Sequence, residues 1–186
     1  MTEIEIIEIV KASMREKRFL HTEGCVRMAE RLAERWNGDV ATVRRAAWLH
    51  DITKEMPYEQ QLQLLSRHGI ILTDMQKSEK IIHAFSGAAF AEYELHEAPE
   101  ICNAVRWHTT ARAGMTLCEK LIWLADLTEE GRTFPGVSEL RALAFKDLSC
   151  ALIKGFDMTL GVLIERGSEI DLNMVEARNF ELASRI

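Results

Sequence analysis

Hydrophobic residues recur along the chain at spacings of three and four positions, the period of a helix with one buried face. Three successive stretches show it, at Ile7, Val10 and Met14, at Met28, Leu32 and Trp36, and at Val40, Val43 and Ala47. No stretch alternates apolar and polar residues as a half-buried strand would. The sequence therefore predicts an all-α fold.

Glycine, proline and helix-capping residues divide the apolar stretches into separate helices. Asn37-Gly38-Asp39 is typical of a helix end followed by a new N-cap, and Pro57 and Pro99 are typical of first helical turns. Helices are expected over residues 3–17, 22–36, 40–51, 58–67, 74–80, 84–96, 99–108, 116–127, 138–146, 148–166 and 173–184. No repeat is evident, so a solenoid is not expected.

Composition limits the classes of protein and of partner. The chain has 186 residues, of which 47% are hydrophobic, and this is enough to form one compact core. A net charge of -6 disfavours a nucleic-acid partner, because affinity for nucleic acid depends on Lys and Arg that neutralise phosphates. A small phosphorylated ligand needs only a local group of cations or a metal and stays compatible with this charge.

Two further features concern the compartment. No stretch reaches the roughly 20 consecutive apolar residues of a membrane-spanning helix, and the N-terminal segment MTEIEIIEIV mixes acidic with apolar residues, unlike a signal peptide. We therefore expect a cytoplasmic protein with no membrane partner. The cysteines, which are far apart and lack zinc-finger spacing, are expected to be buried free thiols: Cys25, Cys102, Cys118 and Cys150.

The adjacent pair His50 and Asp51 is the strongest candidate for chemistry. An apolar helix runs directly into both residues, and burying an imidazole and a carboxylate without partners is unfavourable. A divalent cation would satisfy both groups. Adjacent helical residues point about 100° apart, so further ligands must come from other helices. The candidates are His21, expected at the start of the second helix, and Asp126, which ends another apolar stretch. The alternative is a His at a helix end beside a solvated Asp.

The order His21, His50-Asp51, Asp126 resembles the HD superfamily of metal-dependent phosphohydrolases. Several stretches are similar to one subgroup, the YqeK family of symmetrical diadenosine tetraphosphate hydrolases. They are HDITKE at 50–55, IIHAFSGA at 81–88, AVRWHTT at 104–110, EKLIWLAD at 119–126, EEGRTFPGV at 129–137 and VEARN at 175–179. The similarity runs in order from about residue 20 to the C-terminus. It implies one helical domain over 1–186, with a metal-binding core at about 18–130 and helices at about 138–186 completing the nucleotide site.

The resemblance also implies roles for the ligands. His21, His50, Asp51 and Asp126 would bind the first metal, which in this family is iron, although the same donors suit Mn, Zn or Ni. His83 and His108 occupy the places where relatives hold a second metal or contact phosphate, so one or two ions are expected.

Other residues are candidates for contacts with substrate. Lys54 could meet a phosphate as a point charge or could simply be solvated, and Arg132 could grip phosphate oxygens bidentately. Thr109 and Thr110 could donate hydroxyl hydrogen bonds or could cap a helix end. By resemblance, three further residues lie beside the substrate, namely Thr133, Ile170 and Val175.

The expected reaction is attack by an activated water at the centre of the tetraphosphate bridge, giving two ADP. Lys54 and Arg132 would offset charge on the phosphoryl oxygens, and Asp51 could serve both as ligand and as proton acceptor. The alternatives are hydrolysis of nucleoside mono-, di- or triphosphates and a non-catalytic module that senses nucleotides. The many isoleucines of the first helix suggest either a homodimer face or a helix buried on two sides.

Overall fold

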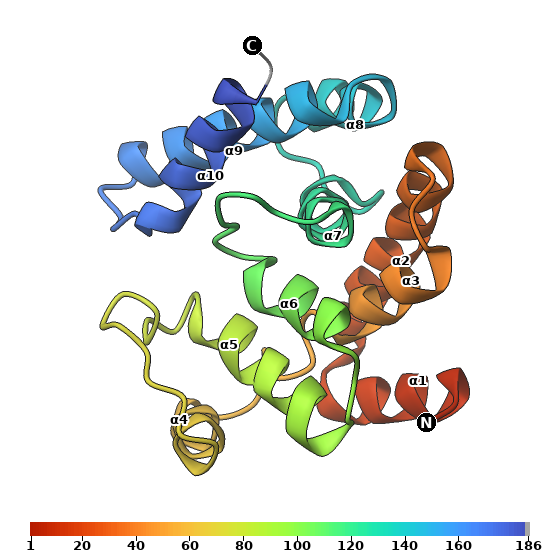
Figure 1. Ribbon diagram of the computed structural model, residues 1–186, viewed down its shortest axis with the longest axis vertical. Coiled ribbons are helices and arrows are strands. Elements are labelled where there is room, and N and C mark those ends of the chain that lie inside the picture. The colour runs from red at the N-terminus through yellow and green to blue at the C-terminus, as the bar shows by residue number, and fades with distance from the viewer. Residues whose placement is uncertain (185–186) are drawn as a thin grey trace.

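Helix α7 (Leu117–Thr128) runs through the middle of the molecule, and other helices surround it (Figure 1). The computed structural model describes residues 1–184, in which no strand occurs, as the hydrophobic pattern predicts. The neighbours that contact α7 are α2 (Glu16–Trp36), α3 (Val40–Leu49), α6 (Pro99–Trp107), α8 (Val137–Lys146) and α9 (Leu148–Glu165). Leu121 and Leu124 of α7 are fully buried among them.

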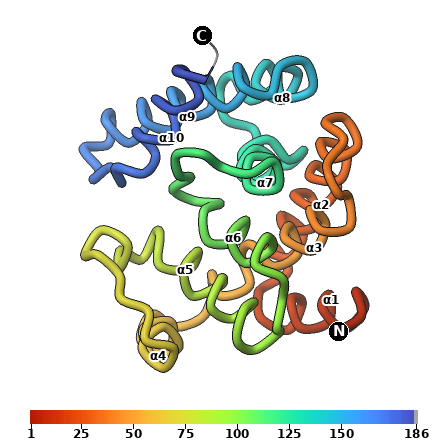
Figure 2. Tube along the Cα trace, viewed as in Figure 1, coloured from red at the N-terminus to blue at the C-terminus, as the bar shows by residue number. Residues whose placement is uncertain are grey.

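The remaining helices extend the bundle at its two ends. They are α1 (Glu3–Ser13), which packs on α3, α4 (Tyr58–Arg67), which packs on α5 (Ile82–Ala89), and α10 (Leu172–Ala183), which packs on α9. The π-helix η1 (Phe90–Glu94) continues α5 directly. The chain trace shows α8, α9 and α10 together at one end and α4 at the other (Figure 2).

Capping residues fix where the central helix begins. The Thr116 side chain accepts a hydrogen bond from the Glu119 backbone N–H at 3.3 Å, and Glu119 accepts from the Thr116 N–H at 3.2 Å. This reciprocal capping box satisfies two donors that the first helical turn would leave unpaired. Asp39 caps α3 in a simpler way by accepting from the Ala41 N–H. The predicted break at Asn37-Gly38-Asp39 is therefore confirmed.

The first helix packs mainly into the chain itself. Ile6 and Val10 are buried in the core, Ile7 and Ile9 are partly buried against it, and Ile4 is 71% exposed. Most of the apolar surface of α1 is thus covered within one chain, and a homodimer through this helix stays a prediction. Within residues 1–184, no helix combines the length and apolar character that crossing a membrane would need.

The expected helix over 74–80 is wrong, because these residues form turns. The Thr73 N–H donates to Gln76 Oε1 at 3.0 Å, and the Gln76 N–H donates to Thr73 Oγ1 at 3.3 Å, as at a helix start. The segment is too short to offset the cost of helix nucleation, so the capped turn does not propagate.

Several helix boundaries also differ from expectation. The first helix ends at Ser13, whose hydroxyl donates to the Val10 carbonyl at 2.8 Å before the chain becomes extended at Met14. The second begins at Glu16, so His21 lies inside α2 rather than at its start. Helix α3 ends one residue before His50, which places the His-Asp pair at the beginning of a series of turns.

Candidate metal centre

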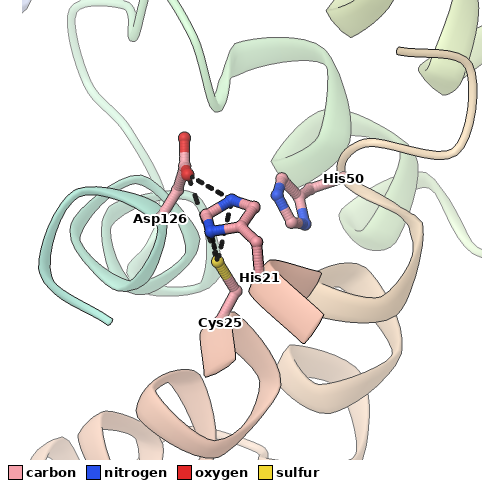
Figure 3. Close-up of side chains that lie close together, drawn as sticks. All are labelled: His21, Cys25, His50 and Asp126. Carbon is pink, nitrogen blue, oxygen red and sulfur yellow. Dashed lines mark hydrogen bonds and ion pairs between the residues drawn. The ribbon is translucent and has the colours of Figure 1, made fainter. Parts of the chain in front are cut away.

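Side chains from three separate helical regions converge on one point (Figure 3). His21 and Cys25 project from α2, His50 follows α3, and Asp126 projects from α7, with one ligand atom of each within 4.8 Å of the others. His21 Nε2 lies 3.0 Å from Asp126 Oδ1. The structure therefore brings together residues separated by about a hundred positions, and three of them belong to the predicted ligand set.

His50 presents an unpaired nitrogen to this point. Its Nδ1 donates to the Ala47 carbonyl at 2.7 Å, which leaves Nε2 without a hydrogen and with its lone pair free. His50 is 1% exposed, and Nε2 has no hydrogen-bond partner among the described residues. A buried acceptor without a partner is unfavourable unless a ligand satisfies it. Bonding of the far nitrogen to a carbonyl is how proteins orient imidazoles toward metals.

The two oxygens of Asp51 face two different groups of histidines. Oδ2 lies 3.5 Å from His50 Nε2 and 4.0 Å from His21 Nε2. Oδ1 lies 3.4 Å from His83 Nε2 and 3.7 Å from His108 Nε2. The carboxylate thus lies between two candidate ion sites and could bridge them, an arrangement found in two-metal hydrolases.

His83 and His108 form the second candidate group together with Asp51. His108 Nδ1 donates to the Val105 carbonyl at 2.6 Å, so in the neutral ring the lone pair is on Nε2. The Nε2 atoms of the two histidines are 3.1 Å apart. Both rings are buried, and their Nε2 atoms lie close to Asp51 Oδ1.

A buried hydrogen-bond chain fixes the turn after Asp51 against α5. Thr53 donates to the His83 carbonyl at 2.9 Å, and its hydroxyl lies 2.7 Å from that of Ser86. Ser86 then donates to Gln61 Oε1 of α4 at 2.9 Å. These contacts place His83 beside the His-Asp pair and explain why a turn region, rather than a helix, can hold the site rigidly.

Burial and neighbouring charges set the protonation of the site. Burial lowers the pKa of His50, and burial together with His108 and Lys54 lowers the pKa of His83 further. Burial disfavours the charged form of His21, but the hydrogen bond to Asp126, the charge of Asp126 and the hydrogen bond to Glu129 together raise its pKa. Asp126 is held ionised by His21, and its pKa is lowered despite burial. Two imidazoles are therefore neutral and able to bind a metal at neutral pH.

Cys25, Glu129 and Arg18 also reach the site, although the sequence did not single them out. Cys25 Sγ lies 3.5 Å from His21 Nε2, Glu129 Oε1 lies 3.2 Å from His21 Nδ1, and Arg18 donates to Asp51 Oδ2 at 2.9 Å. Helical spacing could have found all three. Arg18 and Cys25 are three and four residues from His21, and Glu129 is three residues after Asp126.

The predicted phosphate-binding residues lie around the same centre. Lys54 Nζ is 3.1 Å from the His83 ring nitrogens, and Thr109 Oγ1 is 3.1 Å from His108 Nε2. Arg132 donates through Nη2 to Asp126 Oδ1 at 2.5 Å and through Nε to the Asp126 carbonyl at 2.8 Å. Thr110 instead donates to the Ala111 carbonyl at 3.2 Å, a local backbone contact.

A pocket of about 380 Å³ opens beside Thr109 and Thr110, between the turns at 74–81 and the segment that joins α9 to α10. Its apolar lining includes Ile81, Leu163 and Met174. Ile170 and Val175 are partly buried, but their neighbours Asp171 and Met174 line the pocket in their place. Thr133 is exposed. The roles of these three predicted residues stay predictions.

Comparison with known proteins extends this picture. The sequence model of the HD domain family matches residues 18–131. A symmetrical bis(5'-nucleosyl)-tetraphosphatase of Bacillus subtilis is 36% identical over 171 residues, covering 91% of this chain and 92% of the relative. A protein of the same description from Halalkalibacterium halodurans is 32% identical and covers 88% of each chain.

A solved structure has nearly the same fold. The crystal structure of a predicted HD superfamily hydrolase involved in NAD metabolism, from Clostridium acetobutylicum, superposes with a TM-score of 0.95 at 33% identity. The superposition covers 99% of this chain and 98% of the other. The whole helical arrangement, including the C-terminal helices beyond the matched family segment, is therefore shared with that protein.

Proposed function

The chain belongs to the HD domain family of hydrolases, and we propose that it cleaves diadenosine tetraphosphate at the centre of its phosphate bridge to give two ADP. Water attacks one of the two central phosphorus atoms, and the bond from that same phosphorus to the oxygen of the central bridge breaks. The bridging oxygen leaves with the other half as the second ADP, and the proton of the attacking water is released. Relatives described as symmetrical tetraphosphatases support the proposal, because their similarity to this chain extends over nearly its whole length.

The bare Nε2 of His50 is the observation that carries the metal dependence. This nitrogen is buried, without a hydrogen and without a partner among the described residues, and it points toward His21, Asp51 and Asp126. Neutral imidazoles and ionised carboxylates are the donors that divalent transition metals prefer. We propose His21, His50, Asp51 and Asp126 as the first ligand set, with iron as the metal by family resemblance.

For His83 and His108, the geometry favours a second ion over a direct phosphate contact. Because His108 Nδ1 donates to the Val105 carbonyl, the neutral ring presents a bare Nε2 that can bind a cation but cannot donate to phosphate. Burial keeps the pKa of His83 well below its usual range, so its ring is neutral. One of the two facing Nε2 atoms must offer a lone pair, since they lie 3.1 Å apart, and a lone pair beside Asp51 Oδ1 suits a cation better than a phosphate oxygen.

The bound divalent metal would supply Lewis acidity toward phosphoryl oxygens and would make a water nucleophilic at neutral pH. Arg132 stabilises negative charge beside it: Nε and Nη2 are fixed by Asp126, and Nη1 has no hydrogen bond among the described residues. Lys54 can offer further ammonium hydrogens to phosphate beside His83. Asp51 lies where it could accept a proton from the attacking water. Arg132 and Lys54 would thus offset the charge that develops on the phosphates.

The pocket beside Thr109 and Thr110 is the proposed nucleoside site. Its apolar side chains can cover a base, and the Thr109 hydroxyl lies on the side nearest the histidines. One nucleoside held there would place its phosphate chain across Asp51. The distance from the bound nucleoside would then fix which phosphorus lies beside Asp51. This supports cleavage inside the phosphate chain rather than removal of a terminal phosphate.

A nucleotide panel tests the proposal against the remaining alternatives. Purified protein would be incubated with diadenosine tetraphosphate, diadenosine triphosphate, ATP, ADP, AMP and NAD, and the products separated by chromatography. The proposal expects rapid release of ADP from the tetraphosphate alone. Faster hydrolysis of a mononucleotide or of NAD would assign another substrate, and absence of any hydrolysis by metal-loaded protein would favour a non-catalytic nucleotide-binding module.

A further inference from the structure

A second, cationic pocket lies on the other side of the metal centre. It has a volume of about 780 Å³ and is lined by the N-terminal part of α2 and the loop after α7. The basic residues that line it are Arg15, Lys17, Arg18, Arg27 and Arg132, against the two acids Glu55 and Glu129. Such an excess of positive charge in a chain of net charge -6 indicates an anionic ligand.

Two of these cations have no protein partner. Arg15 pairs with Glu55, Arg18 with Asp51, and Arg132 with Asp126. Lys17 and Arg27 make no ion pair or hydrogen bond with any described residue, and both side chains are exposed at the pocket. Their charge is therefore available to a bound anion.

The two acids of the lining are already neutralised by protein groups. Arg15 donates to Glu55 through its backbone N–H at 2.7 Å and through its guanidinium at 3.2 Å. Glu129 accepts from the Gly131 N–H at 2.5 Å and lies 3.2 Å from His21 Nδ1. Both carboxylates are thus held by protein donors, and the basic residues of the lining outnumber them, so the net charge of the lining is positive.

The two pockets meet the metal centre on opposite sides of Asp51. The nucleoside pocket reaches it through Thr109, next to the histidines that face Asp51 Oδ1. The cationic pocket reaches it through His21 and Arg18, which face Asp51 Oδ2. A substrate that crosses Asp51 must therefore extend from one pocket into the other.

On the basis of the proposed function, we propose that the cationic pocket binds the phosphates of the substrate half that lies away from the nucleoside pocket. Lys17 and Arg27 recognise this half through its charge. No Phe, Tyr or Trp lines the pocket, so an aromatic stacking platform for the second base is absent from its described lining. The site therefore selects a long phosphate chain on this side, with little discrimination of the nucleoside that it carries.

The test is a double variant, Lys17→Gln with Arg27→Gln, and a matched control, Lys154→Gln with Arg166→Gln. The control removes the same two charge types from exposed positions of α9 and its C-cap, where neither side chain makes an ion pair or hydrogen bond among the described residues. The pocket variant should raise the KM for diadenosine tetraphosphate by about tenfold or more and make KM less sensitive to salt. The control should match wild type, and both should retain metal.

A second measurement keeps this inference separate from the proposed function. Binding of inorganic tripolyphosphate to the metal-loaded proteins would be followed by calorimetry. Weaker binding by the pocket variant alone supports the cationic site even if wild-type protein fails to release ADP from the tetraphosphate, an outcome that would refute only the proposed function. Equal tripolyphosphate affinity and equal KM in pocket variant and control would overturn the inference.

Discussion

His21 Nδ1 lies 3.2 Å from Glu129 Oε1, while Nε2 of the same ring lies 3.0 Å from Asp126 Oδ1. The imidazole thus spans two carboxylates, one in the predicted ligand set and one behind it. Glu129 can only accept a hydrogen bond when it is ionised, so it favours a hydrogen on Nδ1 and directs Nε2 toward the metal position. A carboxylate behind a histidine ligand also raises the ligand's basicity.

Replacement of Glu129 by Gln should therefore weaken metal binding by about tenfold to a hundredfold, because the amide lacks the charge that orients and polarises His21. The measurement is a competitive metal titration against a chromophoric chelator. Glu130→Gln is the matched control, since this neighbouring acid is exposed and its one ion pair among the described residues is with Arg31. Equal affinity of the Glu129 and Glu130 variants would show that Glu129 has no positioning role.

Gly24 allows Glu129 to approach α2 closely. A Cβ at this position would lie 2.6 Å from Glu129 Oε2, so Gly24→Ala should displace the carboxylate and destabilise the protein by about 1–3 kcal/mol. It should also weaken metal binding. Gly161→Ala in α9 is the control, because nothing lies within 4 Å of its Cβ position, and it should stabilise the helix by about 0.5–1 kcal/mol. Thermal unfolding that ranks the two variants in the reverse order would contradict this account.

The stability of chelator-treated protein should fall as pH decreases from 7.5 to 5.5. Burial lowers the pKa of His50 and His83 below the ordinary value of 6.5, so the unfolded chain binds protons that the folded chain does not. His21 acts in the opposite direction. Because its pKa is raised, it adds stability below about pH 6.5, and this stability is lost as the pH rises. Two histidines thus lower the stability at acid pH and one raises it, so we expect a net loss of stability.

Melting temperature measured across this range checks the sign. We expect a decrease of a few degrees toward pH 5.5, and a smaller decrease in His83→Gln, which removes one of the two buried imidazoles. A melting temperature that stays constant or rises on acidification would mean that His50 and His83 are not held neutral by burial.

Thiol reactivity should separate Cys150 from the other cysteines. Burial raises the pKa of Cys102 to about 11 and of Cys118 to about 12, and it raises that of Cys25 well above its usual range. Cys150 is partly exposed, contrary to the expectation that all four thiols are buried. When native protein at about pH 8 is treated with a disulfide reagent, one thiol per chain should react rapidly and the others slowly. Cys150→Ser should remove that phase, and a fast phase that persists would place the reactive thiol elsewhere.

The helical fold follows from the sequence because apolar spacing and capping residues act locally. Asp39, Pro57 and Pro99 each mark a helix start that the structure contains. The segment at 74–80 has similar local signals but too little length, and the break at Ser13 depends on a side-chain hydrogen bond to its own backbone. Neither effect changes the hydrophobic pattern, so periodicity alone could not detect them.

The candidate ligands His50, Asp51 and Asp126 were accessible to sequence reasoning because each ends or follows an apolar stretch, whereas His21 was identified by its place in the order of the HD pattern. The supporting groups are only partly accessible, since their roles depend on the packing of α2 against the end of α7. Helical spacing places Glu129 near Asp126, but its position behind His21 follows from the close approach of α2 at Gly24. The cationic pocket likewise depends on which of several arginines remain unpaired in three dimensions.

Titration of chelator-treated protein with metal, while ADP release from diadenosine tetraphosphate is followed, tests the central claim most directly. ADP should be the sole product, its rate should rise with metal and saturate at one or two ions per chain, and Asp51→Ala should neither bind stoichiometric metal nor turn over. Full turnover without metal, full activity of Asp51→Ala, or AMP and ATP as products would contradict the account.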